Sequence, residues 1–287
     1  MSDLRPRRSV LYMPAANARA LEKAKSIPCD AIIFDLEDAV APDAKEMARD
    51  QAVAAVRSGE YGKRELTIRC NGLDTPWGAD DIAAAGVAGP AAVVIPKVAD
   101  AAQLDAVAAQ LAAAGAPETT GIWAMVETPE AIFNAREIAA HARLTAVVMG
   151  TNDLAKELRA RLVPGRAPLL PHLAQALLAC RAMGTVVLDG VCNDLDDAEG
   201  FRAECVQGFE MGFDGKTLIH PKQVEPCNEV WSPTADEIEH AQKVIDAFAA
   251  AEADGRGVVT VDGRMIENLH VENAKRTLAV AAAIAAP

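Results

Sequence analysis

The sequence predicts one (β/α)8 barrel, the TIM-barrel fold, followed by a C-terminal helical arm. Short apolar runs rich in β-branched residues alternate with alanine-rich stretches that favour helix, and this alternation is typical of parallel βαβ units. Eight such runs can be counted, and 287 residues, 51% of them hydrophobic, can bury the core of one barrel. We expect a catalytic barrel domain over residues 1–228 and an arm over residues 229–287.

The expected strands are short runs of mostly Val, Ile, Leu and Met, which favour the extended conformation. In chain order they cover residues 9–13, 31–34, 66–69, 92–95, 122–126, 146–149, 185–188 and 215–219, and the eighth run is the weakest. The helices expected between them cover residues 18–26, 45–58, 99–114, 129–142, 170–183 and 196–211.

The arm begins with an expected helix over residues 234–253. Thr234 is followed three residues later by Glu237, which is the pattern of a capping box. Residues 255–257 (GRG) break the chain, residues 258–263 suggest a short β-turn element, and residues 271–284 favour a last helix.

Composition excludes several classes of partner. The formal net charge of −13 argues against nucleic acid and anionic membranes, because phosphate groups are bound by clustered Lys and Arg. No apolar run approaches the length of a membrane span, and no signal peptide opens the sequence. The six cysteines form no CxxC pair or zinc-ligand spacing, which indicates reduced thiols. We therefore expect a soluble, cytoplasmic enzyme with a small-molecule substrate.

Charged residues follow most of the expected strands. Catalytic groups of a (β/α)8 barrel lie at the C-terminal ends of its strands, so these positions predict the active site. The segments found there are Asp35-Leu36-Glu37-Asp38, Arg69-Cys70-Asn71, Pro96-Lys97, Glu127-Thr128-Pro129, Gly150-Thr151-Asn152-Asp153 and Asp189.

Converging carboxylates favour a bound cation, and oxygen ligands suit Mg²⁺ better than zinc. Glu127 and Asp153 follow adjacent strands, so both carboxylates can reach one ion and leave positions for water and substrate oxygens. Asp153 could instead cap the helix that begins there. Asn152, beside it, could help to hold a substrate carboxylate next to the metal.

Two cations complete the expected site. Arg69 is suited to grip a carboxylate or carbonyl oxygen with its forked guanidinium, and an ion pair to Glu37 or Asp38 is compatible with that role. Lys97 could form a Schiff base, but an acidic surround would keep it protonated, which favours a role as partner of Glu37 or Asp38. The sequence has no Walker A loop, no strand-linked GxGxxG and no nucleophile–base motif.

Taken together, these residues resemble the citrate lyase β-subunit-like (HpcH/HpaI aldolase) superfamily, and in particular its malyl-CoA lyase branch. The resemblance covers nearly the whole chain, and its motifs are specific in combination. They are residues 6–14 (PRRSVLYMP), 35–42 (DLEDAVAP), 69–76 (RCNGLDTP), 95–98 (IPKV), 127–128 (ET) and 219–224 (IHPKQV).

The resemblance implies a Mg²⁺-dependent enzyme, with Mn²⁺ as an alternative ion, that acts on CoA thioesters as a homotrimer or homohexamer. Glu127 and Asp153 match the family's metal ligands, and Arg69 matches the arginine that holds the 2-oxo acid. The residues that fall where the family holds CoA are Tyr12, Lys23, Ile219 and His220.

In this family the C-terminal arm packs on a neighbouring subunit and delivers an aspartate to its active site. The matching residue here is Glu267, which is longer by one methylene. The expected reaction is reversible Claisen-type cleavage of (3S)-malyl-CoA to glyoxylate and acetyl-CoA. Two alternatives stay open: hydrolysis of the thioester to malate and CoA with Glu267 directing water, and a role as the lyase subunit of a citrate lyase complex.

Overall fold

The structure, a computed structural model, describes residues 5–286. It divides into two compact units, of which one spans Arg7–Asn228 and the other takes in the chain from Glu229 onward. Within residues 5–286, none of the helices combines the length and the apolar character that a membrane span requires.

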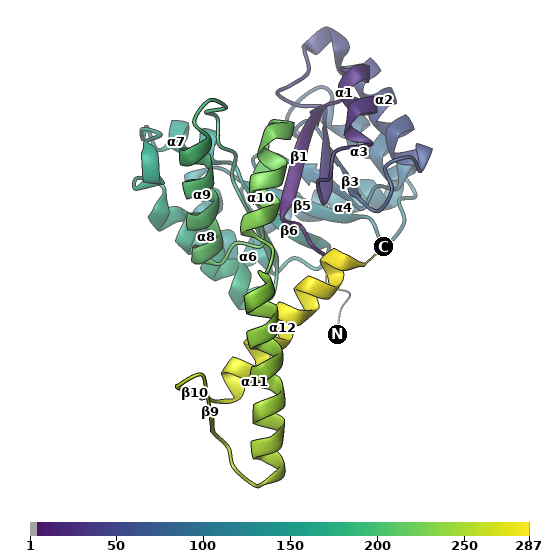
Figure 1. The fold of residues 1–287 in the computed structure, drawn as a ribbon. Helices are drawn as coiled ribbons and strands as arrows, with labels where there is room; N and C mark the ends of the chain where they lie inside the picture. Colours follow the sequence, from purple (N-terminus) through teal and green to yellow (C-terminus); the bar gives the residue numbers. More distant parts are fainter. Residues whose placement is uncertain (1–4, 287) are drawn as a thin grey trace. The chain divides into compact units, whose positions relative to one another are not determined.

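The first unit is a closed barrel of eight parallel strands in the order β1 to β8 (Figure 1). The strands are β1 Ser9–Pro14, β2 Ala31–Asp35, β3 Glu65–Arg69, β4 Ala92–Ile95, β5 Gly121–Val126, β6 Leu144–Met149, β7 Val186–Asp189 and β8 Gly215–Leu218. Pairing of β1 with β8 closes the barrel. The predicted fold class and all eight predicted strands are confirmed, with ends shifted by at most two residues.

Helices follow the strands as expected for βα units. They are α1 Ala18–Ala24, α2 Lys45–Ser58, α3 Gly78–Ala88, α4 Ala101–Ala113, α5 Pro129–Phe133, α6 Ala135–Ala139, α7 Thr151–Glu157, α8 Leu170–Met183, α9 Ala198–Met211 and α10 Val224–Val230. Short 3-10 turns lie at η1 Pro42–Ala44, η2 Pro164–Arg166 and η3 Pro221–Gln223.

One helix prediction needs correction, and the helices α3 and α10 were not predicted. The continuous helix expected over residues 129–142 breaks at Asn134, whose backbone leaves helical geometry (φ −92°, ψ 5°). The Asn134 side chain donates to Ala99 O at 2.9 Å, and such a bond competes with helix continuation. Helix α3 was not predicted, because its glycines and adjacent aspartates weaken the helical signal.

The barrel interior is filled by every second residue of the strands. The buried cluster inside it comprises Val10, Ala31, Ile33, Ala92, Val94, Trp123, Met125, Ala146, Val148 and Leu188. Since side chains of a strand alternate between its two faces, the next inward positions along β2 and β5 are Asp35 and Glu127. Arg69 pairs in register with Asp35 and shares its face. The inward-facing side chains thus change from apolar to polar at the C-terminal ends of the strands.

The second unit consists of α11 Ala235–Ala253, the hairpin of β9 Val259–Val261 and β10 Arg264–Ile266, and α12 Asn268–Ala285. The predicted capping box is confirmed, since the Thr234 side chain accepts from Glu237 N and the Glu237 side chain accepts from Thr234 N. Asp262 and Gly263 join the hairpin strands with φ 47° and 76°, the left-handed pair that a tight hairpin turn requires. A small apolar core holds the unit together: Ala241, Val244, Val261, Ile266, Val271 and Ala274.

Candidate active site

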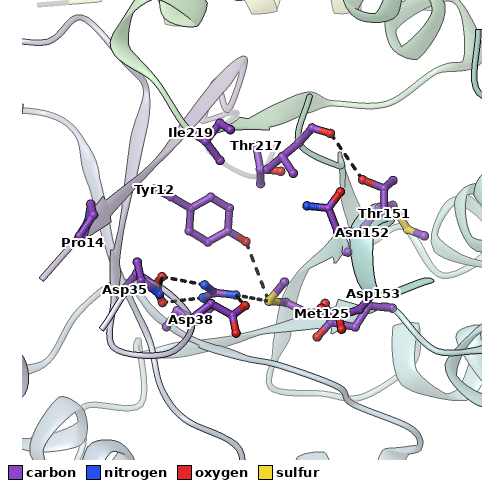
Figure 2. Close-up of a pocket in the computed structure, with 16 residues that line it drawn as sticks. Tyr12, Pro14, Asp35, Asp38, Met125, Thr151, Asn152, Asp153, Thr217 and Ile219 are labelled. Carbon is purple, nitrogen blue, oxygen red and sulfur yellow. Dashed lines mark hydrogen bonds and ion pairs between the residues drawn. The ribbon is translucent and has the colours of Figure 1, made fainter. Parts of the chain in front are cut away.

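A pocket of about 360 Å³ opens at the C-terminal ends of the barrel strands (Figure 2). Its lining combines polar and apolar side chains, and it draws on seven of the strands or the loops after them. The lining residues are Tyr12, Pro14, Asp35, Asp38, Ala39, Arg69, Met125, Glu127, Met149, Gly150, Thr151, Asn152, Asp153, Val191, Thr217 and Ile219.

Glu127 and Asp153 both line this pocket. Glu127 follows β5 and is 2% exposed, while Asp153 lies in the first turn of α7. The backbone N–H of Lys97 donates to Glu127 Oε1 at 2.7 Å. On its other side the carboxylate packs so closely against Gly150 that a Cβ there would overlap Oε2. The backbone on both sides therefore fixes the orientation of the Glu127 carboxylate.

The electrostatics of this pair suit a divalent cation. Burial raises the pKa of Glu127 to about 7, and the neighbouring carboxylates of Glu37 and Asp153 add to the rise. Among residues 5–286, no cluster of three or more His, Cys, Asp and Glu side chains is arranged to hold a metal. Two protein carboxylates with room for water and substrate oxygens fit Mg²⁺, which keeps much of its hydration shell.

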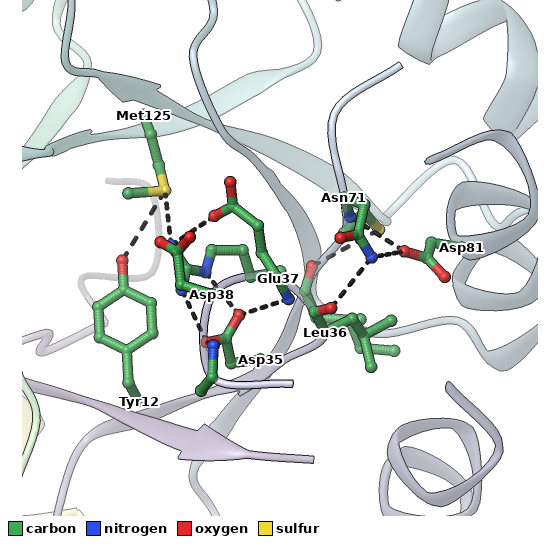
Figure 3. A network of polar contacts seen from close by, with 12 residues as sticks. Tyr12, Asp35, Leu36, Glu37, Asp38, Asn71, Asp81 and Met125 are labelled. Atoms are coloured by element: carbon green, nitrogen blue, oxygen red, sulfur yellow. Dashed lines mark hydrogen bonds and ion pairs between the residues drawn. The ribbon is translucent and has the colours of Figure 1, made fainter. Parts of the chain in front are cut away.

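Arg69 sits at the centre of an acidic cluster (Figure 3). Its Nε and Nη2 donate to the two carboxylate oxygens of Asp35 at 2.6 and 2.7 Å. Its Nη1 lies 2.6 Å from Glu37 Oε2 and 3.3 Å from Asp38 Oδ2. The guanidinium carbon lies 4.9 Å from the centre of the Tyr12 ring. The expected ion pairs to Glu37 and Asp38 are thus present.

The forked pair with Asp35 is the contact that sequence reasoning missed. A signal for it existed, because Asp35 continues the inward pattern of Ala31 and Ile33. The pair uses Nε and Nη2, and Nη1 is the guanidinium nitrogen that faces Glu37 and Asp38 instead. Burial raises the pKa of Glu37 to about 7, although Arg69 opposes the rise.

Lys97 does not have the properties of a Schiff-base lysine. Burial lowers the pKa of its ammonium, but the carboxylates of Glu37, Asp153 and Glu127 outweigh burial and raise it. Its Nζ lies 3.8 Å from Glu37 Oε1. Its backbone has φ 51°, a left-handed conformation that is unusual for a residue with a side chain and that turns the N–H toward Glu127. Lys97 therefore contributes a backbone donor and a positive charge beside Glu37.

The loops after β6 and β7 are joined at the pocket mouth. The side-chain amides of Asn152 and Asn193 exchange two hydrogen bonds, at 3.1 and 2.7 Å. Thr151 Oγ1 donates to Val191 O at 3.5 Å. Ile219, after β8, lines the pocket while 39% exposed.

Two expected site residues of the barrel unit, Lys23 and His220, are not among the residues that line the pocket. Lys23 is exposed on α1 and does not line it. His220 does not line it either, and its Nδ1 accepts from Lys222 N at 3.1 Å at the start of η3. Glu267 belongs to the second unit, where its backbone N–H donates to His270 Nδ1 at 3.0 Å.

Asp189 was expected at the rim and instead faces outward from the barrel. Leu188 occupies the inward position, so the next residue points to the other side of the sheet. There Asp189 is completely buried and pairs with Arg166 at 2.7 Å and Lys216 at 3.1 Å. Burial alone would raise the pKa of Asp189, but these two cations lower it. Asp189 is therefore part of a buried ion cluster outside the pocket.

Comparison with known proteins places these observations in context. The HpcH/HpaI aldolase/citrate lyase family model matches residues 8–221. A (3S)-malyl-CoA thioesterase of Cereibacter sphaeroides is 52% identical over 281 residues, which cover 98% of this chain and 96% of the relative. The citrate lyase β subunit of Escherichia coli is 35% identical, covering 96% and 93% of the two chains. The structure of Mycobacterium tuberculosis CitE with magnesium, acetoacetate and coenzyme A aligns with a TM-score of 0.78 at 28% identity, covering 96% of this chain and 97% of that one.

Proposed function

Since this chain belongs to the HpcH/HpaI aldolase/citrate lyase family, we propose that it is a magnesium-dependent (3S)-malyl-CoA thioesterase. The observation that carries this proposal is the 52% identity, over 98% of the chain, to a relative with that activity. Family membership agrees with the resemblance indicated by the motifs. Between the two expected reactions, however, the relatives favour hydrolysis over carbon–carbon cleavage.

The pocket supports a small hydroxy acid as the acyl group. Glu127 and Asp153 would hold Mg²⁺, which would supply a Lewis acid for the carboxylate and hydroxyl oxygens of the malyl group. Arg69 Nη1 would donate to the same end of the substrate once the Glu37 carboxylate moves away from it. Apolar side chains that line the same pocket, such as Met125, Met149 and Ile219, would help to exclude water from it.

Hydrolysis requires a base near the thioester. Water adds to the thioester carbonyl carbon as the C–S bond breaks, and the proton taken from water passes to the departing CoA thiolate. We assign the base to Glu267 of a neighbouring copy, in a homotrimer or homohexamer. Exposed apolar side chains on either side of Glu267 support an interface there, because Met265 and Leu269 are 60% and 57% exposed in the single chain.

Cleavage to glyoxylate and acetyl-CoA is the second candidate function. The same metal site and Arg69 would stabilise the oxygens of the oxo acid during cleavage, and the relation to a citrate lyase β subunit favours it. In that reaction Glu267 would protonate the acetyl-CoA enolate rather than activate water. The two functions thus share a site and differ in the products.

Product analysis separates the two functions. Purified protein is incubated with (3S)-malyl-CoA and Mg²⁺, and the products are identified by mass spectrometry. Malate with free CoA supports hydrolysis, and glyoxylate with acetyl-CoA supports cleavage. Absence of turnover would refute both and favour a subunit role in a larger lyase complex. A Glu127→Ala variant that keeps full activity after chelation would refute the metal assignment.

A complementation experiment tests the shared site. Glu267→Ala and Glu127→Ala variants are each expected to be inactive, since each lacks one part of every site. If the base comes from a neighbouring copy, unfolding the two variants together and refolding them yields mixed oligomers in which some sites are intact. Activity should then return to a fraction of the wild-type value. No recovery in verified mixed oligomers would contradict the shared site.

A further inference from the structure

A buried lysine that the proposed chemistry does not use lies directly behind the β2–α2 turn. Lys45, the first residue of α2, is 5% exposed. Its ammonium donates to Leu36 O at 2.7 Å and to Glu37 O at 2.8 Å. A third bond runs to Asn71 Oδ1 at 2.7 Å, in the network of Figure 3. The three donors of this ammonium therefore converge on one turn and the loop beside it.

No carboxylate binds the Lys45 ammonium directly, and the Trp77 ring, whose centre lies 5.2 Å from Nζ, is its one aromatic neighbour among the described residues. All three hydrogen bonds end on neutral oxygens, and burial lowers the pKa of Lys45 against the opposing effect of Asp35 and Asp81. A buried cation without a direct counter-charge costs free energy, and an apolar side chain of similar size often packs without that cost. The position of Lys45 suggests a role in the site.

The turn that Lys45 holds carries the acids around Arg69. Within the turn, the Asp35 carboxylate accepts from Glu37 N at 2.9 Å and from Ala39 N at 3.2 Å. Glu37 and Asp38 extend from it to the Nη1 of Arg69. The Asp35 carboxylate thus fixes the turn on its pocket side, and Lys45 binds the carbonyl oxygens of Leu36 and Glu37 on the other side.

Asn71, the third partner of Lys45, is itself held by a network that joins α2 and α3. Asn71 donates to Asp81 Oδ2 from its backbone N at 3.0 Å and from Nδ2 at 2.6 Å. Asp81, on α3, is completely buried and accepts from Arg49 Nε of α2 at 2.7 Å. A displacement of the turn would therefore break its bonds to Lys45 of α2 and to Asn71, which Asp81 of α3 holds in place.

We propose that Lys45 is a positioning residue, which fixes the β2–α2 turn so that Glu37 and Asp38 orient Arg69 toward the acyl end of the substrate. This inference rests on the proposed function. Lys45 itself touches no residue of the metal pair, so its effect should reach the substrate through Arg69 rather than through Mg²⁺ affinity.

The test compares Lys45→Met with the control Lys63→Met, which changes an exposed lysine before β3. A misplacement of about 1 Å in an active site can cost about 100-fold in rate. We therefore expect Lys45→Met to lower kcat/KM about 100-fold while the Mg²⁺ affinity stays within about threefold of wild type. A purely structural role would lower the unfolding temperature and leave the kinetics of the folded protein unchanged, which would overturn the inference.

A rescue experiment separates the lysine's charge and hydrogen bonds from general packing. Lys45→Cys, alkylated with 2-bromoethylamine under mild denaturant and refolded, regains a side chain of lysine length with a terminal ammonium. We expect kcat/KM to recover at least about tenfold, the usual lower range for a positioning contact. Wild type treated in parallel controls for alkylation of the native cysteines, of which Cys192 is the one partly exposed. Complete alkylation at position 45 without recovery would contradict the inference.

A measurement that needs no substrate keeps this inference separate from the proposed function. The Nε–H of Arg69, assigned in nuclear magnetic resonance spectra with an Arg69→Lys variant, reports the bond to Asp35. We expect that signal to shift or broaden in Lys45→Met and to stay unchanged in Lys63→Met. An unchanged Arg69 signal would refute the positioning role even if malyl-CoA were not the substrate. Failure of wild type to hydrolyse malyl-CoA, with the signal shifted, would refute only the proposed function.

Discussion

Glu127→Gln should remove the part of the pH dependence of the unfolding free energy that comes from Glu127 in the metal-free protein. Burial raises the pKa of Glu127 from its usual 4.5 to about 7, so the folded chain keeps a proton that the unfolded chain releases. Stability therefore falls as pH rises between those two values and is level above them. Each pKa unit corresponds to about 1.4 kcal/mol, so the total loss from this group is on the order of 3 kcal/mol. Glutamine resembles the protonated acid and has no such loss.

Urea unfolding with excess chelator, followed by tryptophan fluorescence, to which the buried Trp123 contributes, measures this effect between pH 4.5 and pH 8. Wild type and Glu127→Gln should be similarly stable at the acidic end, and the variant should become the more stable by on the order of 3 kcal/mol at the alkaline end. Glu37 is present in both proteins, and its effect on the pKa of Glu127 is part of the measured difference. Saturating Mg²⁺ should reverse the order in favour of wild type. A difference that does not change with pH would refute the assignment of a desolvated acid.

Three further predictions concern other parts of the molecule. Gly150→Ala should weaken Mg²⁺ binding about 10- to 100-fold, because the added Cβ would displace the Glu127 carboxylate, and calorimetry giving wild-type affinity would contradict this. Asp189→Asn should lower the free energy of unfolding by about 3 kcal/mol, since it removes the buried charge shared by Lys216 and Arg166; an unchanged urea midpoint would be inconsistent with that cluster. Thr234→Ala should lower the free energy of unfolding of the arm by about 1 kcal/mol, because it removes the capping box of α11. An unchanged thermal unfolding curve would contradict the capping box.

The candidate site was predictable to the extent that it follows strand ends. Glu127 and Asp153 were found because each follows an apolar run, and runs of that kind end at the same rim of a parallel barrel. Arg69 was found for the same reason. The rule places a residue at the rim, but it does not say toward which face of the strand its side chain points.

That distinction accounts for the error at Asp189. Side chains alternate along a strand, and the pairing register decides which set faces inward. In the observed strand Leu188 pairs with Gly215 and Asp189 with Lys216, a register that the run of apolar residues does not reveal. The inward position belongs to Leu188, and the carboxylate of Asp189 lies outside the barrel with Lys216.

The sequence by itself determined the barrel, because alternating apolar strands and alanine-rich helices are local patterns that survive without knowledge of contacts. It also indicated that Glu127, Asp153 and Arg69 reach the rim. Only the tertiary structure decided their partners. The forked pair of Arg69 with Asp35, the bond from Lys97 N to Glu127 and the bond from Lys45 to Asn71 join segments distant in the chain. Such contacts depend on register and on the packing of α2 and α3, which no local pattern encodes.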